Sequence, residues 1–367
     1  MNSLLQRLGI ELPIIQGPMA GADTPRLAAA VSQAGGLGML GCGMRSPAAM
    51  AEAAAAVRAA TAKPFGMNLF VLPTPSPDPA VVQAAMARLA PLYAEFGLEP
   101  EPPERWCEDF GAQFEALIAA RPVVASFTFG ILDAAQVRRL RDEAGSVVIG
   151  TATTPAEALA WQAVGADAVC VSGMEAGGHR GTFLPRSGMT DGSGQPSAED
   201  FAASMIGTMA LVPQCVDALS IPVIAAGGIM DGRGIAAAQA LGAQAVQMGT
   251  AFLACPESAV TSAQREAMAC ARATDTRVTR IYSGRSARGI VNAMMERLVC
   301  DEASVPEYPI QNALTGALRR VAAARGRADY LSLWAGQGVA AARELPAPEL
   351  MARLAHEWRT ACGALSG

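Results

Sequence analysis

Residues 222–250 read PVIAAGGIMDGRGIAAAQALGAQAVQMGT, and this stretch has the pattern of one strand–helix–strand unit. The apolar runs at 222–226 and 245–250 predict buried strands, and the alanine-rich segment 233–241 between them has helical periodicity. Two strands joined through a helix run parallel, because the crossover returns the chain to the end from which it started. The stretch therefore predicts a parallel sheet covered by helices.

The same alternation recurs along most of the chain. Eight short apolar runs predict strands at 13–19, 36–40, 65–71, 123–129, 147–151, 168–172, 222–226 and 245–250. Segments with helical periodicity follow at 25–34, 48–60, 79–96, 134–144, 155–164, 200–219, 233–241 and 258–271. Eight such pairs across about 270 residues fit an α/β fold of the (β/α)8 TIM-barrel type, for which about 250 residues is typical. An open doubly wound sheet is the alternative.

Two segments lie outside this repeat. Residues 72–121 open with a proline-rich run and predict a helical insertion after the third strand. Residues 279–367 predict a mostly helical C-terminal extension that packs on a barrel made by residues 1–278. An insertion after a barrel strand lies at the catalytic face, where it can help to shape a pocket. The segment 182–196, rich in glycine and polar residues, is a candidate mobile loop.

Composition argues against several classes of protein. No apolar run approaches the roughly 20 residues that cross a bilayer, and no basic, then apolar, leader is visible, so we expect a cytoplasmic protein. The net charge of −5 without a basic run argues against nucleic acid or membrane partners. The eight cysteines are scattered, so no metal site is expected. Lys63 is the only lysine, and its context suits neither a Schiff-base enzyme nor a P-loop.

Glycines and hydrogen-bonding side chains gather where the predicted strands end. In a barrel these ends meet at one face, and phosphates often bind there through backbone amides after strands seven and eight. Gly227 and Gly228 follow the seventh strand, and Gly249 and Thr250 end the eighth. The alternative is that these glycines only permit tight turns. A phosphate at this place could belong to a sugar phosphate, a nucleotide or flavin mononucleotide (FMN).

Other strand ends offer groups that suit a planar ring. Asn68 and Gln247 could supply fixed amide contacts, or they could satisfy buried backbone groups. Pro18 and Met19 could form an apolar platform for the ring, with core packing as an equal alternative.

His179 is one of only two histidines, and it lies among glycines directly after the sixth predicted strand. That position favours a functional group, with a flexible loop as the alternative. The neighbouring Arg180 would either attract an anionic substrate or form a surface ion pair. His356 lies on a C-terminal helical pattern, and we expect it to be structural or exposed.

Seven motifs occur in a characteristic order: QGPMAG at 16–21, AGGLG at 34–38, MNLF at 67–70, EAGGHRG at 175–181, AAGGIMDGRG at 225–234, QMGTAFL at 247–253 and WAGQ at 334–337. Together they resemble the nitronate monooxygenase family, formerly called 2-nitropropane dioxygenases. That family shares a flavin-binding barrel with the flavin-dependent enoyl-acyl carrier protein reductases. The resemblance spans nearly the whole chain.

The resemblance implies a bound FMN and a role for His179 as the active-site base or an orienting group. The implied reaction is the oxidation of alkyl nitronates by O2 to a carbonyl compound and nitrite through a flavin semiquinone, with propionate 3-nitronate as one candidate substrate. A nitronate or nitroalkane and O2 are then the partners of a monomer or homodimer. The implied cofactor-binding residues are Pro18, Met19, Asn68, Ser172, Gly177, Gly178, Gly227, Gly228, Gln247, Met248, Gly249 and Thr250, with the phosphate on Gly227, Gly228, Gly249 and Thr250 and the isoalloxazine near Asn68.

Three positions mark departures from the family pattern or leave it open. Many members have glutamine where Ser172 stands, and some have a second histidine where this chain has Thr128. Tyr308 is the best candidate for the active-site tyrosine of some relatives, with a surface tyrosine as the alternative. Two other functions stay open: an NAD(P)H-dependent flavin reductase of enoyl thioesters or quinones, and a flavin-free isomerase or lyase of phosphorylated sugars.

Overall fold

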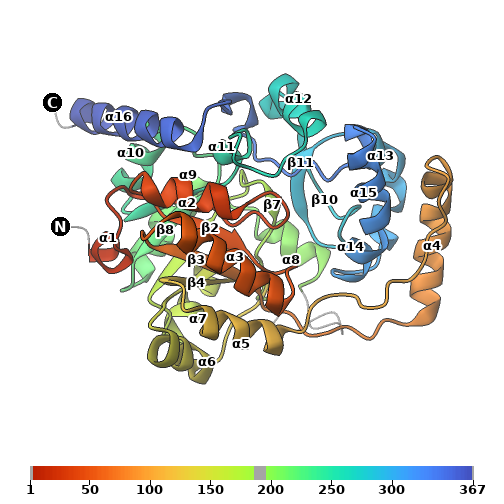
Figure 1. Ribbon diagram of the computed structural model, residues 1–367, viewed down its shortest axis with the longest axis horizontal. Helices are drawn as coiled ribbons and strands as arrows, with labels where there is room; N and C mark the ends of the chain where they lie inside the picture. The colour runs from red at the N-terminus through yellow and green to blue at the C-terminus, as the bar shows by residue number, and fades with distance from the viewer. Residues whose placement is uncertain (1–2, 186–195, 366–367) are drawn as a thin grey trace.

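The computed structural model describes residues 3–185 and 196–365, and within them eight parallel strands close into a barrel (Figure 1). Its order is β1-β9-β8-β6-β5-β4-β3-β2. The amide of Gln16 donates to the carbonyl of Leu37 (2.9 Å) and the amide of Leu37 to that of Ile14 (3.0 Å), which joins β1 to the start of β2. The (β/α)8 prediction is confirmed, and the doubly wound alternative is wrong. The strands are β1 (Ile14–Gln16), β2 (Gly38–Gly41), β3 (Phe65–Phe70), β4 (Val124–Thr128), β5 (Val147–Ala152), β6 (Ala168–Ser172), β8 (Val223–Ala226) and β9 (Ala245–Met248).

Apolar side chains fill the inside of the barrel. Ile15, Met39 and Ile224 belong to one buried cluster in this interior, because alternate residues of a strand point to opposite faces. The short helix α1 (Ser3–Leu8) adds the fully buried Leu4 and Leu8 to the same cluster.

Helices cover the outside of the barrel, and three of them begin with the same local chemistry. The hydroxyls of Thr24, Ser46 and Thr154 each accept a hydrogen bond from an amide of the following turn, and proline occupies the next position. The covering helices are α2 (Pro25–Gln33), α3 (Pro47–Ala60), α5 (Phe110–Ala120), α6 (Ala134–Arg139) with the π-helical turn η1 (Leu140–Ala144), α7 (Pro155–Ala163), α9 (Thr208–Ala218) and α10 (Gly232–Ala240).

Two predicted helices exist but do not cover the barrel. α4 (Pro79–Ala94) and α12 (Ser262–Cys270) contribute instead to a second apolar cluster. α5 packs beside α3 in the place expected for α4, and α16 (Ala347–Leu365) lies against α10 and α2. The buried Leu350, Met351 and Leu354 of α16 join the barrel core, so a helix from the far end of the chain supplies the eighth cover.

The helix predicted at 200–219 is interrupted, which corrects that expectation. α8 (Ala198–Ala203) ends before residue 204, and α9 begins at Thr208. The guanidinium of Arg180 donates to the carbonyl of Ser204 (2.9 Å), and the carboxylate of Glu175 accepts from the amide of Thr208 (3.0 Å). These partners satisfy backbone groups that a continuous helix would pair internally.

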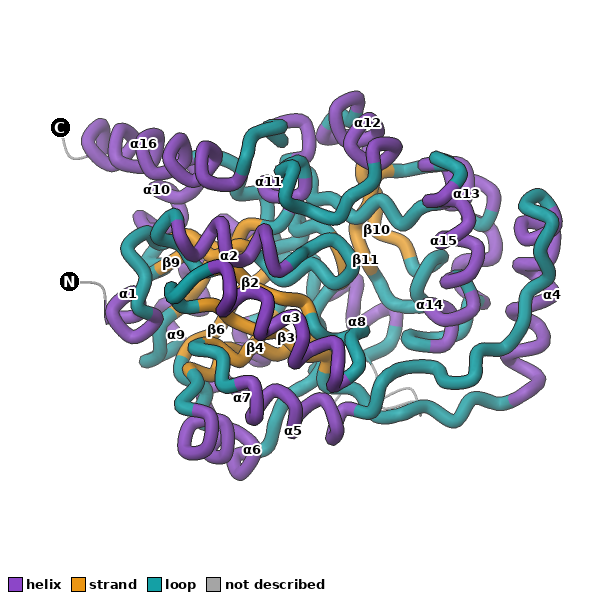
Figure 2. Tube along the Cα trace, viewed as in Figure 1, coloured by secondary structure: helices purple, strands orange, loops and turns teal. Residues whose placement is uncertain are grey.

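A second lobe lies beside the open end of the barrel (Figures 1 and 2). The expected helical C-terminal segment is confirmed, but the lobe also holds an antiparallel sheet that the sequence did not predict. This sheet pairs β11 (Ala287–Ile290) with β10 (Thr276–Thr279) and with β7 (Gly178–His179), so Ala287 lies opposite His179. The predicted boundary at residue 278 stays a prediction. Further elements are α11 (Thr250–Leu253), α13 (Ala293–Arg297), α14 (Ile310–Leu314), α15 (Gly316–Ala324) and the 3-10 turns Ala273–Asp275, Val299–Ser304, Ala328–Tyr330 and Val339–Ala341.

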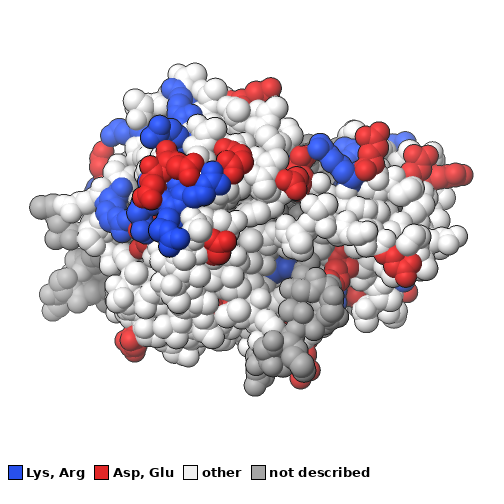
Figure 3. Space-filling view, turned by 90° about the horizontal axis from the view of Figure 1, so that it is seen from below, with Lys and Arg blue, Asp and Glu red and all other residues white. Residues whose placement is uncertain are grey.

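On the face shown in Figure 3, charges of both signs are interspersed rather than separated. Arg139 of α6, for example, pairs with Glu115 (2.8 Å) and Glu143 (2.7 Å). Among the described residues, no helix is long and apolar enough to cross a membrane, and no group of three or more His, Cys, Asp or Glu side chains could hold a metal ion. Most of the predicted mobile loop at 182–196 lies outside the described residues.

Candidate active site

A cavity of about 380 Å³ lies at the carboxyl ends of the barrel strands, where the second lobe adjoins the barrel. The lobe contributes Tyr308, Asn312, Arg319 and Trp334 to its lining. All thirteen residues predicted for the site line this cavity, although their roles stay predictions: Pro18, Met19, Asn68, Ser172, Gly177, Gly178, His179, Gly227, Gly228, Gln247, Met248, Gly249 and Thr250.

The glycines after β8 and β9 present backbone amides at one side of the cavity. Gly227 has a φ of +113°, and a Cβ there would lie 2.7 Å from Thr208 Oγ1, so no other residue fits without rearrangement. No hydrogen bond among the described residues uses the amides of Gly227, Gly228 or Gly249 as donors. Thr250 Oγ1 accepts from the Gly336 amide (2.9 Å), which leaves its own proton to donate. Unpaired amides of this kind suit the oxygens of a phosphate.

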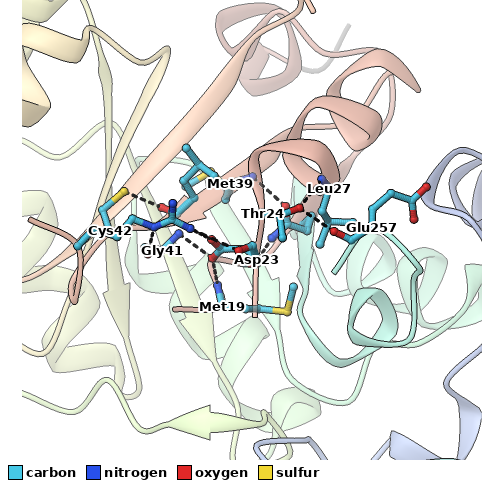
Figure 4. A network of polar contacts seen from close by, with 12 residues as sticks. Met19, Asp23, Thr24, Leu27, Met39, Gly41, Cys42 and Glu257 are labelled. Atoms are coloured by element: carbon cyan, nitrogen blue, oxygen red, sulfur yellow. Dashed lines mark hydrogen bonds and ion pairs between the residues drawn. The ribbon is translucent and has the colours of Figure 1, made fainter. Parts of the chain in front are cut away.

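The loop that carries Pro18 and Met19 is held by a buried carboxylate that the sequence did not single out (Figure 4). Asp23 Oδ2 accepts from the amides of Met19 and Gly41, both at 2.7 Å, and Arg45 pairs with Oδ1 at 2.8 Å. Burial raises the pKa of Asp23 to about 6, although Arg45 and the two amides oppose that shift. This network fixes one wall of the cavity.

Asn68 is buried and its amide group is oriented by β4. Its Nδ2 donates to Ser126 Oγ (2.9 Å) and Thr128 Oγ1 (3.3 Å), so the predicted alternative of a backbone partner for this side chain is wrong. Thr128 in turn contacts Thr151 Oγ1 (3.1 Å). Within the described residues Asn68 Oδ1 and the Gln247 side chain form no hydrogen bond, which leaves both to a ligand.

His179 is held in the short strand β7, so the flexible-loop interpretation is wrong. Its Nε2 lies 2.8 Å from Ser283 Oγ, and that hydroxyl donates to the carbonyl of Arg285 (3.1 Å). With the serine proton donated there, Nε2 would carry the imidazole proton and Nδ1 would keep the lone pair. Burial, reinforced by the charges of Arg285 and Arg319, lowers the pKa of His179 to about 3. The ring is therefore neutral at physiological pH.

Aromatic rings surround His179. The centroids of Phe129, Tyr308 and Trp334 lie 5.4, 5.5 and 5.3 Å from its ring. Tyr308 is buried and burial raises its pKa, so the surface-tyrosine alternative is wrong. Phe129 has a φ of +78°, a strained conformation for an aromatic residue, with the guanidinium of Arg285 4.2 Å from its ring centroid.

The surroundings of Arg180 show that both predicted roles, attraction of an anionic substrate and a surface ion pair, are wrong. It is almost fully buried and donates to the carbonyls of Ser172 (2.9 Å), Gly173 (2.8 Å) and Ser204 (2.9 Å). It thus fixes the backbone after β6 and neither attracts a substrate nor forms a surface pair. His356 is exposed on α16, as expected.

A (β/α)8 barrel with such a cavity at its strand ends has the architecture of a TIM-barrel enzyme. The family model described as nitronate monooxygenase matches residues 2–357, and the chain belongs to that family. It is an oxidoreductase.

Similar proteins agree over nearly the full length. A nitronate monooxygenase of Pseudomonas aeruginosa is 46% identical over 96% of this chain and 97% of that protein, and a probable nitronate monooxygenase of Staphylococcus haemolyticus is 42% identical over 98% and 97%. The crystal structure of nitroalkane oxidase from Streptomyces ansochromogenes has a TM-score of 0.89 at 41% identity, covering 99% of this chain and 100% of that one. FabK from Thermotoga maritima has a TM-score of 0.75 at 31% identity, covering 99% and 98%.

Proposed function

We propose that this protein binds FMN and oxidises alkyl nitronates with O2 to a carbonyl compound and nitrite. One observation carries the proposal: a single cavity is lined both by the unpaired amides of Gly227, Gly228 and Gly249 and by a neutral, oriented His179. The nitronate monooxygenases among the relatives support the reaction class. Propionate 3-nitronate is a candidate substrate.

The residues present fit FMN. Gly227, Gly228, Gly249 and Thr250 would hold the phosphate through three amides and a hydroxyl. Asn68 Oδ1 and the Gln247 amide would contact the polar edge of the ring, because no protein group in the described chain uses them. Pro18, Met19, Ser172, Gly177, Gly178 and Met248 would complete the lining of the site. The flavin would supply the electron transfer and O2 chemistry that side chains lack.

His179 would act through Nδ1, with Nε2 donating to Ser283. A pKa of about 3 keeps Nδ1 unprotonated but makes the imidazole a weak base. We therefore propose that the substrate arrives already ionised, as a nitronate. A nitroalkane must first lose a proton to His179 and would react more slowly. The rings of Tyr308 and Trp334 would hold the alkyl chain beside the imidazole.

The likeness to FabK supports a second candidate, an NAD(P)H-dependent reductase of enoyl thioesters or quinones. The visible spectrum of the purified protein tests the cofactor, since a retained flavin colours it and a colourless protein contradicts FMN binding. Anaerobic mixing with NADH or NADPH then separates the reactions. Rapid bleaching of the flavin would favour the reductase, whereas bleaching by a nitronate alone supports the proposed oxidation.

A further inference from the structure

Thr208 lies behind the turn that carries two of the amides proposed to bind the phosphate, and the function described so far gives it no role. It is buried at the start of α9, and its Oγ1 lies 3.0 Å from the carbonyl oxygen of Gly227 and 3.4 Å from that of Ala226. The amide of Gly173, directly after β6, also donates to the Ala226 carbonyl (2.9 Å). Both carbonyls of the turn are therefore held on the side of α9 and β6.

These contacts decide where the amides of the turn point. A trans peptide is planar, and its N–H is directed opposite to its C=O. Holding the Ala226 carbonyl thus directs the amide of Gly227 away from β6, and holding the Gly227 carbonyl directs the amide of Gly228 away from Thr208. Both glycines line the cavity. Their φ angles of +113° and +71° are ones that glycine adopts without strain, so the turn can keep this arrangement.

Glu175 holds Thr208 in this position. Both oxygens of its carboxylate accept from the Thr208 amide (3.0 Å each), and Oε2 lies 2.8 Å from Thr208 Oγ1. The single hydroxyl proton of Thr208 is thus shared between Glu175 and the Gly227 carbonyl. Gly207, the N-cap of α9, has no side chain for this purpose, so Glu175 takes the place of the capping residue and its charge is favoured by the helix N-terminus.

The same carboxylate decides where an anion can bind. Glu175 lines the cavity next to the turn, since a Cβ on Gly228 would lie 3.2 Å from the Cβ of Glu175. It occupies the Thr208 amide at the start of α9, which would otherwise attract a phosphate. A phosphate is therefore left with the glycine amides, and their geometry depends on Thr208.

We infer that Thr208 is a positioning residue for the phosphate of the cofactor: its hydroxyl fixes the 227–228 peptide so that the Gly228 amide points at the phosphate. The inference rests on the proposed function for the identity of the bound group. It concerns the phosphate alone, because the Thr208 hydroxyl contacts the glycine turn, whereas Asn68 and Gln247 are the groups proposed for the ring. The protein should then bind FMN more tightly than riboflavin, which lacks the phosphate, and this difference should depend on the Thr208 hydroxyl.

Equilibrium binding of the two flavins tests this inference without turnover. The full-length protein, freed of flavin by dialysis, would be titrated with FMN and with riboflavin while the flavin fluorescence is recorded. Thr208→Val removes the hydroxyl and keeps the shape of the side chain, and we expect it to weaken FMN binding about tenfold and riboflavin binding less than about threefold. Thr208→Ser keeps the hydroxyl and should bind FMN within about threefold of the unaltered protein.

Thr154→Val is the matched control, because it removes a hydroxyl from the start of the neighbouring helix α7, where Oγ1 accepts from the Glu157 amide (3.3 Å). It should lower the melting temperature without changing the ratio of the two flavin affinities. Equal weakening of both flavins by Thr208→Val, or no weakening of FMN, would overturn the inference. If Thr208→Val does not fold, Thr208→Ala is measured in its place, and the same results decide.

Failure of the proposed function gives a different result. If the unaltered protein binds neither flavin, FMN is not its cofactor, and titration with inorganic phosphate then decides the role of Thr208. Weaker phosphate binding by Thr208→Val than by Thr154→Val would support a phosphate site that depends on Thr208, whereas equal binding or none would overturn it.

Discussion

Replacing His179 with glutamine separates proton removal from the rest of the reaction. Glutamine can still donate to Ser283 Oγ through its amide, but it has no lone pair equivalent to Nδ1. The fall of the His179 pKa from 6.5 to about 3 corresponds to about 5 kcal/mol against the protonated ring. A base this weak contributes at the lower end of the usual range, so we expect nitroalkane oxidation to slow about 100-fold, or about 3 kcal/mol.

Nitronates have already lost that proton, so their oxidation by His179→Gln should slow less than about tenfold. The assay is oxygen uptake at pH 7.5 with freshly dissolved nitroalkane and with preformed nitronate of the same chain length. His356→Gln, at the exposed histidine of α16, is the control and should match the unaltered protein. Equal slowing of both substrate forms, with flavin content and melting temperature preserved, would refute this account of His179.

Further predictions concern the glycines proposed to bind the phosphate, the proton on the His179 imidazole, and the stability of the fold. Gly227→Ala should weaken flavin affinity at least tenfold in a flavin-release titration because its Cβ meets Thr208, whereas Gly97→Ala, at φ +69° with no atom near, should not. Ser283→Ala should slow nitroalkane oxidation about tenfold, less than His179→Gln, since either imidazole nitrogen can then carry the proton. The unfolded chain binds a proton at His179 below pH 6.5, whereas the folded protein binds one only below about pH 3. Between these values His179 therefore lowers the free energy of unfolding as the pH falls, by up to about 1.4 kcal/mol per pH unit. In denaturant unfolding, the free energy of unfolding of His179→Gln should fall less steeply with pH. Asp23→Asn should lower the unfolding free energy by about 1–3 kcal/mol at pH 8, where the carboxylate of Asp23 holds two amides, and a stability equal to that of the unaltered protein would contradict its role.

Much of the barrel could be predicted because its signals are local. The apolar run at Ala168–Ser172 became β6 with the same bounds, and the hydroxyl–proline pairs at Thr24 and Ser46 start helices through contacts within one turn. Barrel geometry made the glycines after β8 and β9 candidates for the site, the family resemblance pointed to the same residues, and they line the cavity.

The contacts that the sequence did not reveal join distant segments. His179 meets Ser283 only because β7 pairs with β11, and a two-residue strand leaves no periodic pattern. Asp23 and Arg45 form an ion pair through a fold of the chain that no spacing rule describes. Arg180 and Arg319 look alike in sequence, yet one binds three carbonyls and the other lines the cavity. Their surroundings, rather than their residue type, decide the roles.

Oxygen uptake measured together with nitrite release tests the central proposal most directly. The purified protein, with its flavin retained, would be mixed with alkyl nitronates of increasing chain length in the absence of NADH and NADPH. We expect oxygen to be consumed with release of nitrite and the matching carbonyl compound. A flavin-containing protein that consumes no oxygen and releases no nitrite with any of these nitronates would contradict the proposed function.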